Sequence, residues 1–285
     1  MEEINRDEIG VLLFVTQTPD YESPSTACVL HKRLGLSKEC IAFDVNLGCS
    51  GFVFGLNIAS SLLHSSKARY ALVLVGDTLA RKNTLFTRVK ASHAEAMLFG
   101  DSGTATLLEK AGTGSLLVSS HTDGNSYKAI IHPYGWWRHP EVSAEKVKNN
   151  ETMDDIAVFN FATIEAVRQI NDYLKDTGTS PDDYDCLVLH QANKMIIKRI
   201  GKKTGFPDEK NLVSIDTFAN TSGASIPVTL VKTYGDLNED RRIRALCCGY
   251  GVGLSWATAV VDMNVRDIYP FIHTDDYYDD GFTHI

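Results

Sequence analysis

A cysteine stands at a predicted junction between a strand and a helix. In NLGCSGF, Cys49 follows the strand-like run IAFDV and precedes the helix-like run VFGLNIASSLL. The first-turn N–H groups of a helix carry partial positive charge, so a sulfur beside them is favoured as the nucleophilic thiolate. A buried cysteine is more often a small apolar residue in a tight turn. Both interpretations of Cys49 stay open on this stretch alone.

Two polar residues occupy similar junctions later in the chain. His190 closes the strand-like run DCLVLH, and Asn220 precedes the helix-like run GASIPVTLVKTY. In an open α/β sheet, ligands bind at the carboxyl ends of the strands. Either residue alone is usually structural, the asparagine as a helix cap. A cysteine, a histidine and an asparagine at three such junctions favour a catalytic site made of Cys49, His190 and Asn220.

A basic amphipathic helix is predicted directly after the histidine. In KMIIKRIGKK, apolar residues at helical spacing separate four lysines, which we call the basic face: Lys194, Lys198, Lys202 and Lys203. Such a face is either a solvated surface or a dock for an acidic or phosphate-bearing partner. The net charge of the whole chain is −8, so this basic character is local and does not indicate a general nucleic-acid binder.

The composition narrows the class of protein further. The six cysteines lack CxxC spacing and the histidines lack metal-ligand spacing, so we expect neither disulfides nor a metal. No apolar run reaches the roughly 18 residues of a membrane helix. The charged start MEEINRDEIG differs from a signal peptide. We therefore expect a cytoplasmic protein with no membrane partner.

Strand-like and helix-like runs alternate, which is typical of an α/β protein. The runs EIGVLLFVTQT, CIAFDV, YALVLVGD and ATLLEK predict strands, and STACVLHKRLGL and GFVFGLNIASSLLHSS predict helices. The pattern restarts after residues 112–115 with a helix over about 155–176, the strands DCLVLH and NLVSID, a further helix and a closing hairpin. Segment 121–152, which contains Trp136 and Trp137, is predicted to be an irregular loop.

A short internal repeat connects the two halves. Asp44 is followed after four residues by Cys-Ser-Gly, and Asp216 after four residues by Thr-Ser-Gly. The shared pattern D-x4-(C/T)-S-G suggests a duplicated α/β unit in which two helix N-termini face one site.

Five segments together resemble the β-ketoacyl-acyl-carrier-protein synthase III family. They are FDVNLGCSGFVFGL, LVLHQANKMIIKRIGKKTG, TFANTSGASIPV, TPDYESPSTACVLHKRLG and CGYGVGLSWATAVV, and the resemblance runs from Glu8 to Met263. It implies a thiolase-like fold with two pseudo-duplicated α/β halves in αβαβα layers. It places the halves at residues 1–112 and 113–263, with an acidic aromatic tail at 264–285. Members usually have a further strand and helix at the front, so we expect an incomplete N-terminal half.

The resemblance also implies roles for particular residues. Cys49 would accept an acyl group from acyl-CoA, and His190 and Asn220 would stabilise the enolate formed when malonyl-acyl carrier protein loses CO2. The backbone N–H groups of Cys49 and Val252 would hold the acyl carbonyl. The basic face would dock acyl carrier protein, which is acidic. We expect a homodimer in fatty acid or related biosynthesis, with these two substrates and no further cofactor.

Three alternatives stay open on the sequence. The chain could be an acyltransferase that uses Cys49 without decarboxylation, or a non-catalytic partner subunit with the same fold. A papain-type hydrolase also has cysteine, histidine and asparagine in this chain order, although the residues around Cys49 differ from its pattern. The acyl primer cannot be deduced from the sequence.

Overall fold

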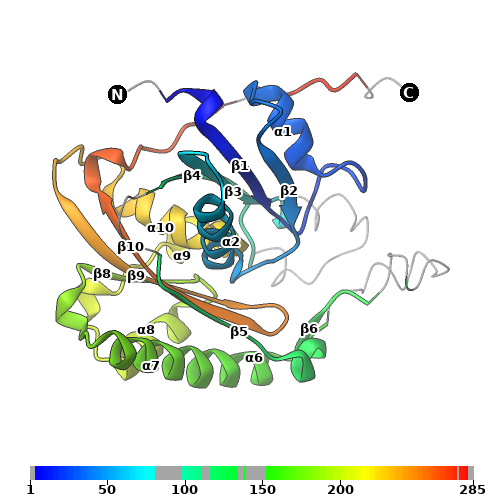
Figure 1. Ribbon diagram of the computed structural model, residues 1–285. Helices are drawn as coiled ribbons and strands as arrows, with labels where there is room; N and C mark the ends of the chain where they lie inside the picture. The colour runs from blue at the N-terminus through cyan, green and yellow to red at the C-terminus, as the bar shows by residue number, and fades with distance from the viewer. Residues whose placement is uncertain are drawn as a thin grey trace.

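The computed structural model describes residues 4–80, 98–110, 116–133, 138, 152–274 and 276–281. Within these ranges the chain forms two four-stranded sheets stacked on one another, with helices between and outside them (Figure 1). Trp136 and Trp137 lie outside the described residues. So does the predicted boundary at residue 112 between the two halves, which stays a prediction.

The first sheet has the order β2-β1-β3-β4. Its strands are β1 (Ile9–Val15), β2 (Ile41–Val45), β3 (Tyr70–Asp77) and β4 (Ser102–Glu109). β1 runs parallel to β2 and β3, and β4 is antiparallel to β3. β1 is almost wholly apolar because helices cover both faces of its sheet, as is usual for a central parallel strand.

The second sheet has the order β5-β10-β9-β8. Its strands are β5 (Val118–Thr122), β8 (Cys186–Leu189), β9 (Arg242–Gly251) and β10 (Ser255–Asn264), and β6 (Ile130–Ile131) and β7 (Thr152–Met153) form a separate ribbon. β8 is parallel to β9, and β9 and β10 form an antiparallel hairpin. The three strands β8, β9 and β10 therefore repeat the arrangement of β1, β3 and β4. β5 has no counterpart beside β4 in the described part of the chain.

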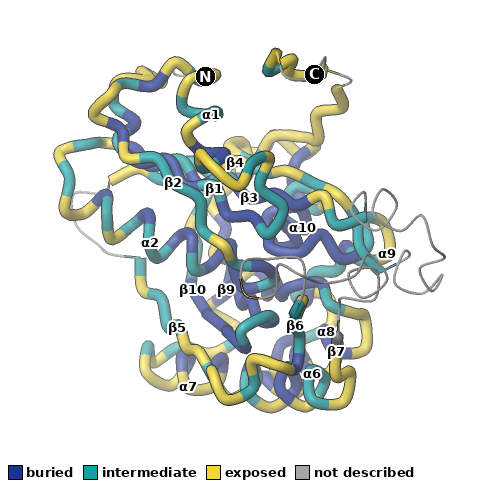
Figure 2. The backbone as a smooth tube through the Cα atoms, turned by 90° about the vertical axis from the view of Figure 1, so that its right-hand side faces the viewer, coloured by how far each residue is buried: buried dark blue, intermediate teal, exposed yellow. Residues whose placement is uncertain are grey.

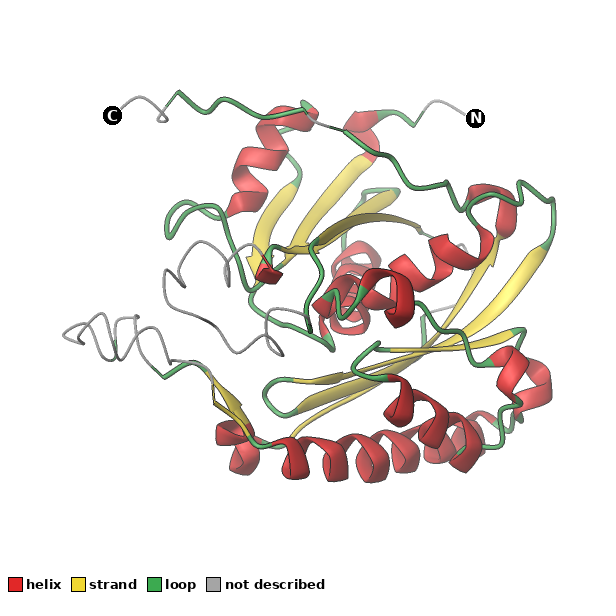
Figure 3. Cartoon of the chain, turned by 180° about the vertical axis from the view of Figure 1, so that it is seen from behind, coloured by secondary structure: helices red, strands yellow, loops and turns green. Residues whose placement is uncertain are grey.

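The helices complete five layers. They are α1 (Thr26–Leu34), α2 (Gly51–Ser65), α6 (Asp155–Phe161), α7 (Val167–Thr177), α8 (Lys194–Lys203), α9 (Ile215–Phe218) and α10 (Ser225–Tyr234). Short turns of helix are η1 (Arg6–Glu8), η2 (Gly124–Ala129), η3 (Ala162–Ala166), η4 (Pro181–Asp183), η5 (Asp208–Lys210), η6 (Ser222–Ala224) and η7 (Val265–Asp267). α1 covers the outside of the first sheet, α2 and α10 lie between the sheets, and α7 and α8 cover the outside of the second sheet (Figures 1 and 3).

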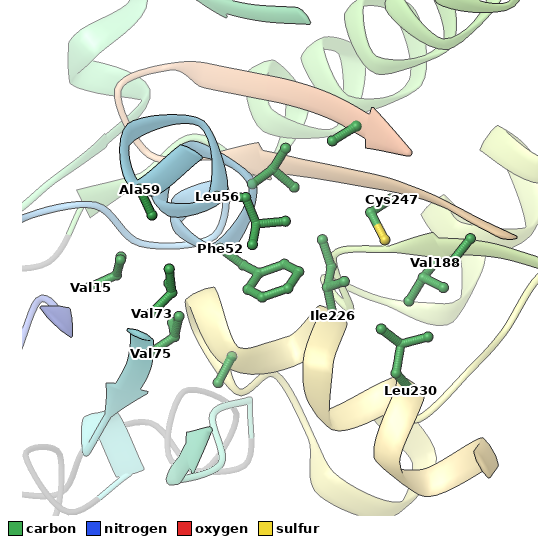
Figure 4. Packing of buried hydrophobic residues seen from close by; sticks show 14 of the residues in the cluster. Val15, Phe52, Leu56, Ala59, Val73, Val75, Val188, Ile226, Leu230 and Cys247 are labelled. Carbon is green, nitrogen blue, oxygen red and sulfur yellow. The ribbon is translucent and has the colours of Figure 1, made fainter. Parts of the chain in front are cut away.

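The middle layer is the main hydrophobic core. α2 is apolar on nearly all sides because a sheet lies above it and another below it. Phe52 and Leu56 of α2 belong to one cluster with Val73 and Val75 of β3 and Ile226 of α10 (Figure 4). Buried residues are correspondingly concentrated in the central strands and in α10 (Figure 2). No described helix is both long enough and apolar enough to cross a membrane.

Three predictions are wrong in detail. Segment 121–152, predicted as an irregular loop, contains the end of β5, all of η2 and the ribbon strand β6 in its described part. The run NLVSID, predicted as a strand, forms only a single bridge at Asn211 and then enters α9. The reason is local: the side-chain oxygen of Gln191 accepts the backbone N–H groups of Ser214 and Ile215 at 2.8 and 3.3 Å, which occupies donors that a strand ladder would use.

The helix predicted over about 155–176 is likewise interrupted. A π turn, η3, separates α6 from α7. At this turn the Thr163 hydroxyl donates to the carbonyl of Phe159 at 2.8 Å, a side-chain bond that competes with the regular ladder and bends helices.

Leu56→Ala tests the middle layer. Leu56 is fully buried between the sheets, so truncation leaves a cavity and should lower the free energy of unfolding by about 2–5 kcal/mol in urea denaturation. Leu237→Ala is the matched control, since Leu237 is 45% exposed and its loss should cost less than about 0.5 kcal/mol. Similar small losses for both variants would contradict the assignment of this layer as the core.

Candidate active site

Cys49 lies in the turn between β2 and α2, one residue before the N-cap Ser50. The turn is closed by a hydrogen bond from Gly51 N–H to Gly48 O of 2.7 Å. A side chain at position 51 would meet Val15, since a Cβ there would lie 2.5 Å from Val15 Cγ1. The helix start is thus pressed against β1, and Cys49 is held, partly exposed, at the positive end of a 15-residue helix.

The end of β9 lies directly against this turn. A Cβ on Gly251 would be 2.5 Å from Cys49 Cβ and 3.0 Å from its Sγ. A Cβ on Gly249 would be 2.9 Å from Ser50 Cα. Only bare backbone therefore fits against Cys49 from this side. Val252 follows Gly251 at the hairpin turn, so its main chain begins beside the sulfur.

Two serines hold the hairpin turn to the start of α2. Ser255 Oγ donates to Val252 O at 2.7 Å, so its hydrogen is used. Ser50 Oγ, 2.7 Å from Ser255 Oγ, must then be the donor in that second bond. This buried pair fixes the position of Val252 relative to α2.

His190 follows β8 and is almost fully buried. Its backbone N–H continues the sheet by donating to Cys248 O at 2.9 Å, and the residue is only 2% exposed. The Tyr250 ring meets the imidazole edge to face at 5.5 Å, and the Tyr250 hydroxyl donates to His190 O at 3.1 Å. Nδ1 of the imidazole lies 2.8 Å from Ser225 Oγ.

Burial controls the charge of His190. It lowers the pKa of the imidazole to about 3, because the imidazolium would lose its hydration, and a hydrogen bond with the backbone of Ser222 opposes this to a smaller extent. His190 is therefore neutral near pH 7. A neutral imidazole has one N–H donor and one acceptor nitrogen.

Asn220 is oriented by its own turn. Its Oδ1 accepts the backbone N–H of Ser222 at 2.9 Å. Its backbone N–H donates to Leu98 O, and its backbone carbonyl accepts from Gly100 N–H, so the residue is tied to the segment just before β4. The residue is 6% exposed. Within the described ranges its amide nitrogen has no acceptor, so the carboxamide presents an available donor.

Contacts between the halves bring the three predicted residues to one place. A Cβ on Gly223 would lie 2.9 Å from Gly48 O, so η6 rests on the turn that carries Cys49. The backbone N–H of Ser222 in η6 donates to Asn220 Oδ1, and the Ser222 backbone also forms a hydrogen bond with the His190 ring. On the other side, Gly251 contacts Cys49 and the neighbouring Tyr250 packs on His190. The same small region thus contains a sulfur at a helix N-terminus, a neutral imidazole and a carboxamide.

The basic face lies apart, on the outer layer. α8 buries its isoleucines against the second sheet and exposes its lysines. Lys194 forms a 3.9 Å ion pair with Asp216, and Lys203 reaches Thr163 O at 3.5 Å. Lys198 and Lys202 have no ion-pair partner among the residues that the structure describes. Part of the face is therefore open to an acidic partner.

Sequence reasoning missed the polar residues behind His190. Gln191 and Ser225 are fully buried, and Gln191 Nε2 donates to Leu189 O at 2.8 Å. The sequence signal that could have indicated them is a polar residue at the end of an apolar run. Gln191 follows LVLH, and Ser225 precedes IPVTLV. Such residues are buried only when they find partners, which the sequence does not name.

Other predicted features concern metals and disulfides. No group of three or more metal-ligating side chains occurs in the described part of the chain. All six cysteines lie within it, and none forms a disulfide.

A cavity of about 370 Å³ lies between β5 and α7, lined by residues that include His121, Gln169 and Trp256. It is on the outer side of the second sheet, away from Cys49.

This architecture is the thiolase-like fold. The structure superposes on the crystal structure of 3-oxoacyl-(acyl-carrier protein) synthase from Burkholderia xenovorans with a TM-score of 0.83 and 33% identity, over 94% of this chain and 77% of that one. The family model of 3-oxoacyl-acyl-carrier-protein synthase III matches residues 43–125, and the model of its C-terminal part matches 174–263. These ranges contain Cys49, His190 and Asn220.

Curated relatives agree with the structural match. β-Ketoacyl-acyl-carrier-protein synthase III of Clostridium perfringens is 30% identical over 263 residues, which cover 91% of this chain and 79% of the relative. The enzyme of the same name from Streptococcus equi is 33% identical over 256 residues, 89% of this chain and 77% of the relative. The chain belongs to the β-ketoacyl-acyl-carrier-protein synthase III family of acyltransferases, as the motifs around Cys49 and His190 predicted.

The buried histidine predicts a pH dependence of stability. The pKa of His190 is about 3 in the folded chain and about 6.5 in the unfolded chain, so between these values the unfolded state binds more protons and stability falls as pH falls. Each pH unit in this window should cost about 1.4 kcal/mol. Urea unfolding at pH 7 and pH 5 should show wild type losing about 2 kcal/mol more than His190→Gln. Equal losses in the two proteins would contradict a buried neutral His190.

Proposed function

We propose that the chain is a condensing enzyme of the synthase III type, which joins an acyl group from acyl-CoA to a two-carbon unit from malonyl-acyl carrier protein. The observation that supports the proposal is the packing of the turn that carries Cys49 against η6 and the end of β9, which contact Asn220 and His190.

The first step is acylation of Cys49. The thiolate, favoured at the start of α2, attacks the acyl-CoA carbonyl; an S–C bond forms, the bond to the CoA sulfur breaks, and CoA leaves and takes up a proton. The backbone N–H groups of Cys49 and Val252 would hold the carbonyl oxygen as it gains charge. The absence of a side chain at Gly251 supports this role, because the main chain itself faces the sulfur.

The second step forms the new carbon–carbon bond. The malonyl group loses CO2, and the electron pair of the broken bond moves onto the thioester oxygen as an enolate. His190 and Asn220 donate hydrogen bonds to that oxygen, each worth about 3 kcal/mol in such settings. The enolate carbon then attacks the Cys49 thioester, the C–S bond breaks, and the thiolate is regenerated. A neutral His190 suits this role because it donates a hydrogen bond without transferring its proton.

Two of the earlier alternatives stay available, and one does not. An acyltransferase without decarboxylation would need Cys49 but not the two donors, and a non-catalytic partner subunit would need none of the three. The thiolase-like fold and the family membership overturn the papain-type hydrolase. The presence of both donors favours condensation over plain acyl transfer.

The partners follow from two surfaces. The open lysines of the basic face suit an acidic acyl carrier protein. β2 is the edge strand that leads to Cys49; none of its residues is buried, and Ile41 is 49% exposed. Pairing of β2 with a second copy would cover this edge and form a homodimer with two-fold symmetry. We infer a cytoplasmic homodimer that acts in fatty acid or related biosynthesis.

Separate measurement of the two steps tests the proposal. Incubation with a panel of acyl-CoA primers should add one acyl mass to the intact protein, and Cys49→Ala should abolish it, whereas Cys28→Ala, at an exposed cysteine, should not. His190→Ala and Asn220→Ala should keep the adduct but slow CO2 release from malonyl-acyl carrier protein about 100-fold to 1,000-fold. No adduct with any primer would favour the non-catalytic subunit, and an adduct without CO2 release would favour plain acyl transfer.

Charge reversal tests the basic face. Lys198→Glu with Lys202→Glu should raise KM for malonyl-acyl carrier protein at least about 10-fold at low salt, with a smaller effect at high salt because the attraction is screened. Acylation by acyl-CoA should be unchanged. The control is Lys32→Glu with Lys38→Glu, exposed lysines in and after α1 on the opposite outer layer. An equal effect of both pairs would contradict docking at α8.

A further inference from the structure

The pair formed by His190 and Ser225 is unusually well enclosed. Ser225 opens α10 and is fully buried, and its Oγ lies 2.8 Å from His190 Nδ1. The hydrogen of the neutral imidazole can sit on Nδ1 or on Nε2, and only an Nε2–H ring donates from Nε2. The direction of the Ser225 bond therefore bears on what His190 can donate, together with the hydrogen bond between the ring and the Ser222 backbone.

The surroundings of Ser225 set that direction. A serine hydroxyl has one hydrogen and two lone pairs. The backbone N–H of Gln191 donates to Ser225 Oγ at 3.3 Å and so occupies a lone pair. In the described structure, His190 Nδ1 is the one remaining polar partner of this oxygen. If Nδ1 carried the hydrogen, the buried Ser225 hydroxyl would have no acceptor, which is unfavourable.

We propose that Ser225 is a positioning residue that donates to Nδ1 and thereby keeps the ring hydrogen of His190 on Nε2, where it can reach the enolate oxygen. The role rests on the proposed function. Ser225 acts only through His190 and does not touch the substrate.

Neighbouring bonds hold the donor in place. The Ser225 carbonyl accepts the Thr229 hydroxyl at 2.7 Å, and the Gln191 side chain is itself anchored to Ser214 and Leu189. The backbone N–H of Gln191 therefore stays directed at Ser225. The resulting order of donation is Gln191 N–H to Ser225 Oγ and Ser225 Oγ–H to His190 Nδ1, which leaves the ring hydrogen on Nε2, the nitrogen that faces away from Ser225.

The proposal separates the two steps of the reaction. Acylation of Cys49 depends on the start of α2 and on backbone groups, none of which Ser225 contacts in the described structure. Decarboxylation depends on the Nε2 donor. Loss of the Ser225 hydroxyl should therefore slow CO2 release while leaving acylation intact.

The test is the tautomer itself, read by NMR of protein labelled with ¹⁵N-histidine. The His190 signals are assigned by their loss in His190→Gln. Wild type should show an unprotonated Nδ1 and a protonated Nε2 at pH 7. A protonated Nδ1 would overturn the proposal, whether or not the protein turns over.

Variants complete the experiment. Ser225→Ala should shift the His190 signals toward a mixture of tautomers and slow CO2 release between about 10-fold and 100-fold, with KM and Cys49 acylation unchanged. Thr233→Val is the control, since it removes a hydroxyl two turns further along α10, which donates to the Thr229 carbonyl at 2.8 Å, and should leave these signals unmoved. A Ser225→Ala protein with wild-type signals and rate would also overturn the role. Absence of acylation in wild type would instead defeat the proposed function and leave the tautomer result readable.

Discussion

The site depends on one close approach, the contact of Gly223 with the carbonyl of Gly48. The turns before α2 and before α10 meet there, with no space for a Cβ on Gly223. Each turn starts a helix of the middle layer, so packing of that layer sets the distance between them. Cys49 comes from one turn and Asn220 from just ahead of the other. The core of the protein and the geometry of its chemistry are thus parts of the same packing arrangement.

Burial gives the polar residues of this region their chemical character. An exposed histidine would be partly charged near neutral pH, whereas enclosure by Tyr250 and β9 keeps His190 neutral. Enclosure also requires that each polar atom find a partner. Gln191 and Ser225 meet that requirement, and in doing so they orient the imidazole. The residues that stabilise this part of the fold are therefore the ones that would tune the reaction.

Individual hydrogen bonds between side chains and the backbone explain where the sequence patterns predicted the wrong structure. NLVSID has the composition of a strand, yet Gln191 captures the backbone of Ser214 and Ile215. The long helix over about 155–176 has the right periodicity, yet the Thr163 hydroxyl competes for a ladder carbonyl. Both competitors are single polar side chains, and periodicity is insensitive to them. The internal repeat held in part, because both Ser-Gly turns lead into middle-layer helices, but Asp44 lies in a strand and Asp216 in a helix.

The sequence by itself determined the alternation of strands and helices, the junction position of Cys49, the basic face of α8 and the family. These follow from periodicity, helix-start chemistry and motif composition, which act over a few neighbouring residues. Only the tertiary structure decided that Cys49, His190 and Asn220 meet, that His190 is neutral, and that Ser225 stands behind it. Those properties arise from contacts between segments that are distant in the sequence and from the burial that this packing produces, which no local pattern encodes.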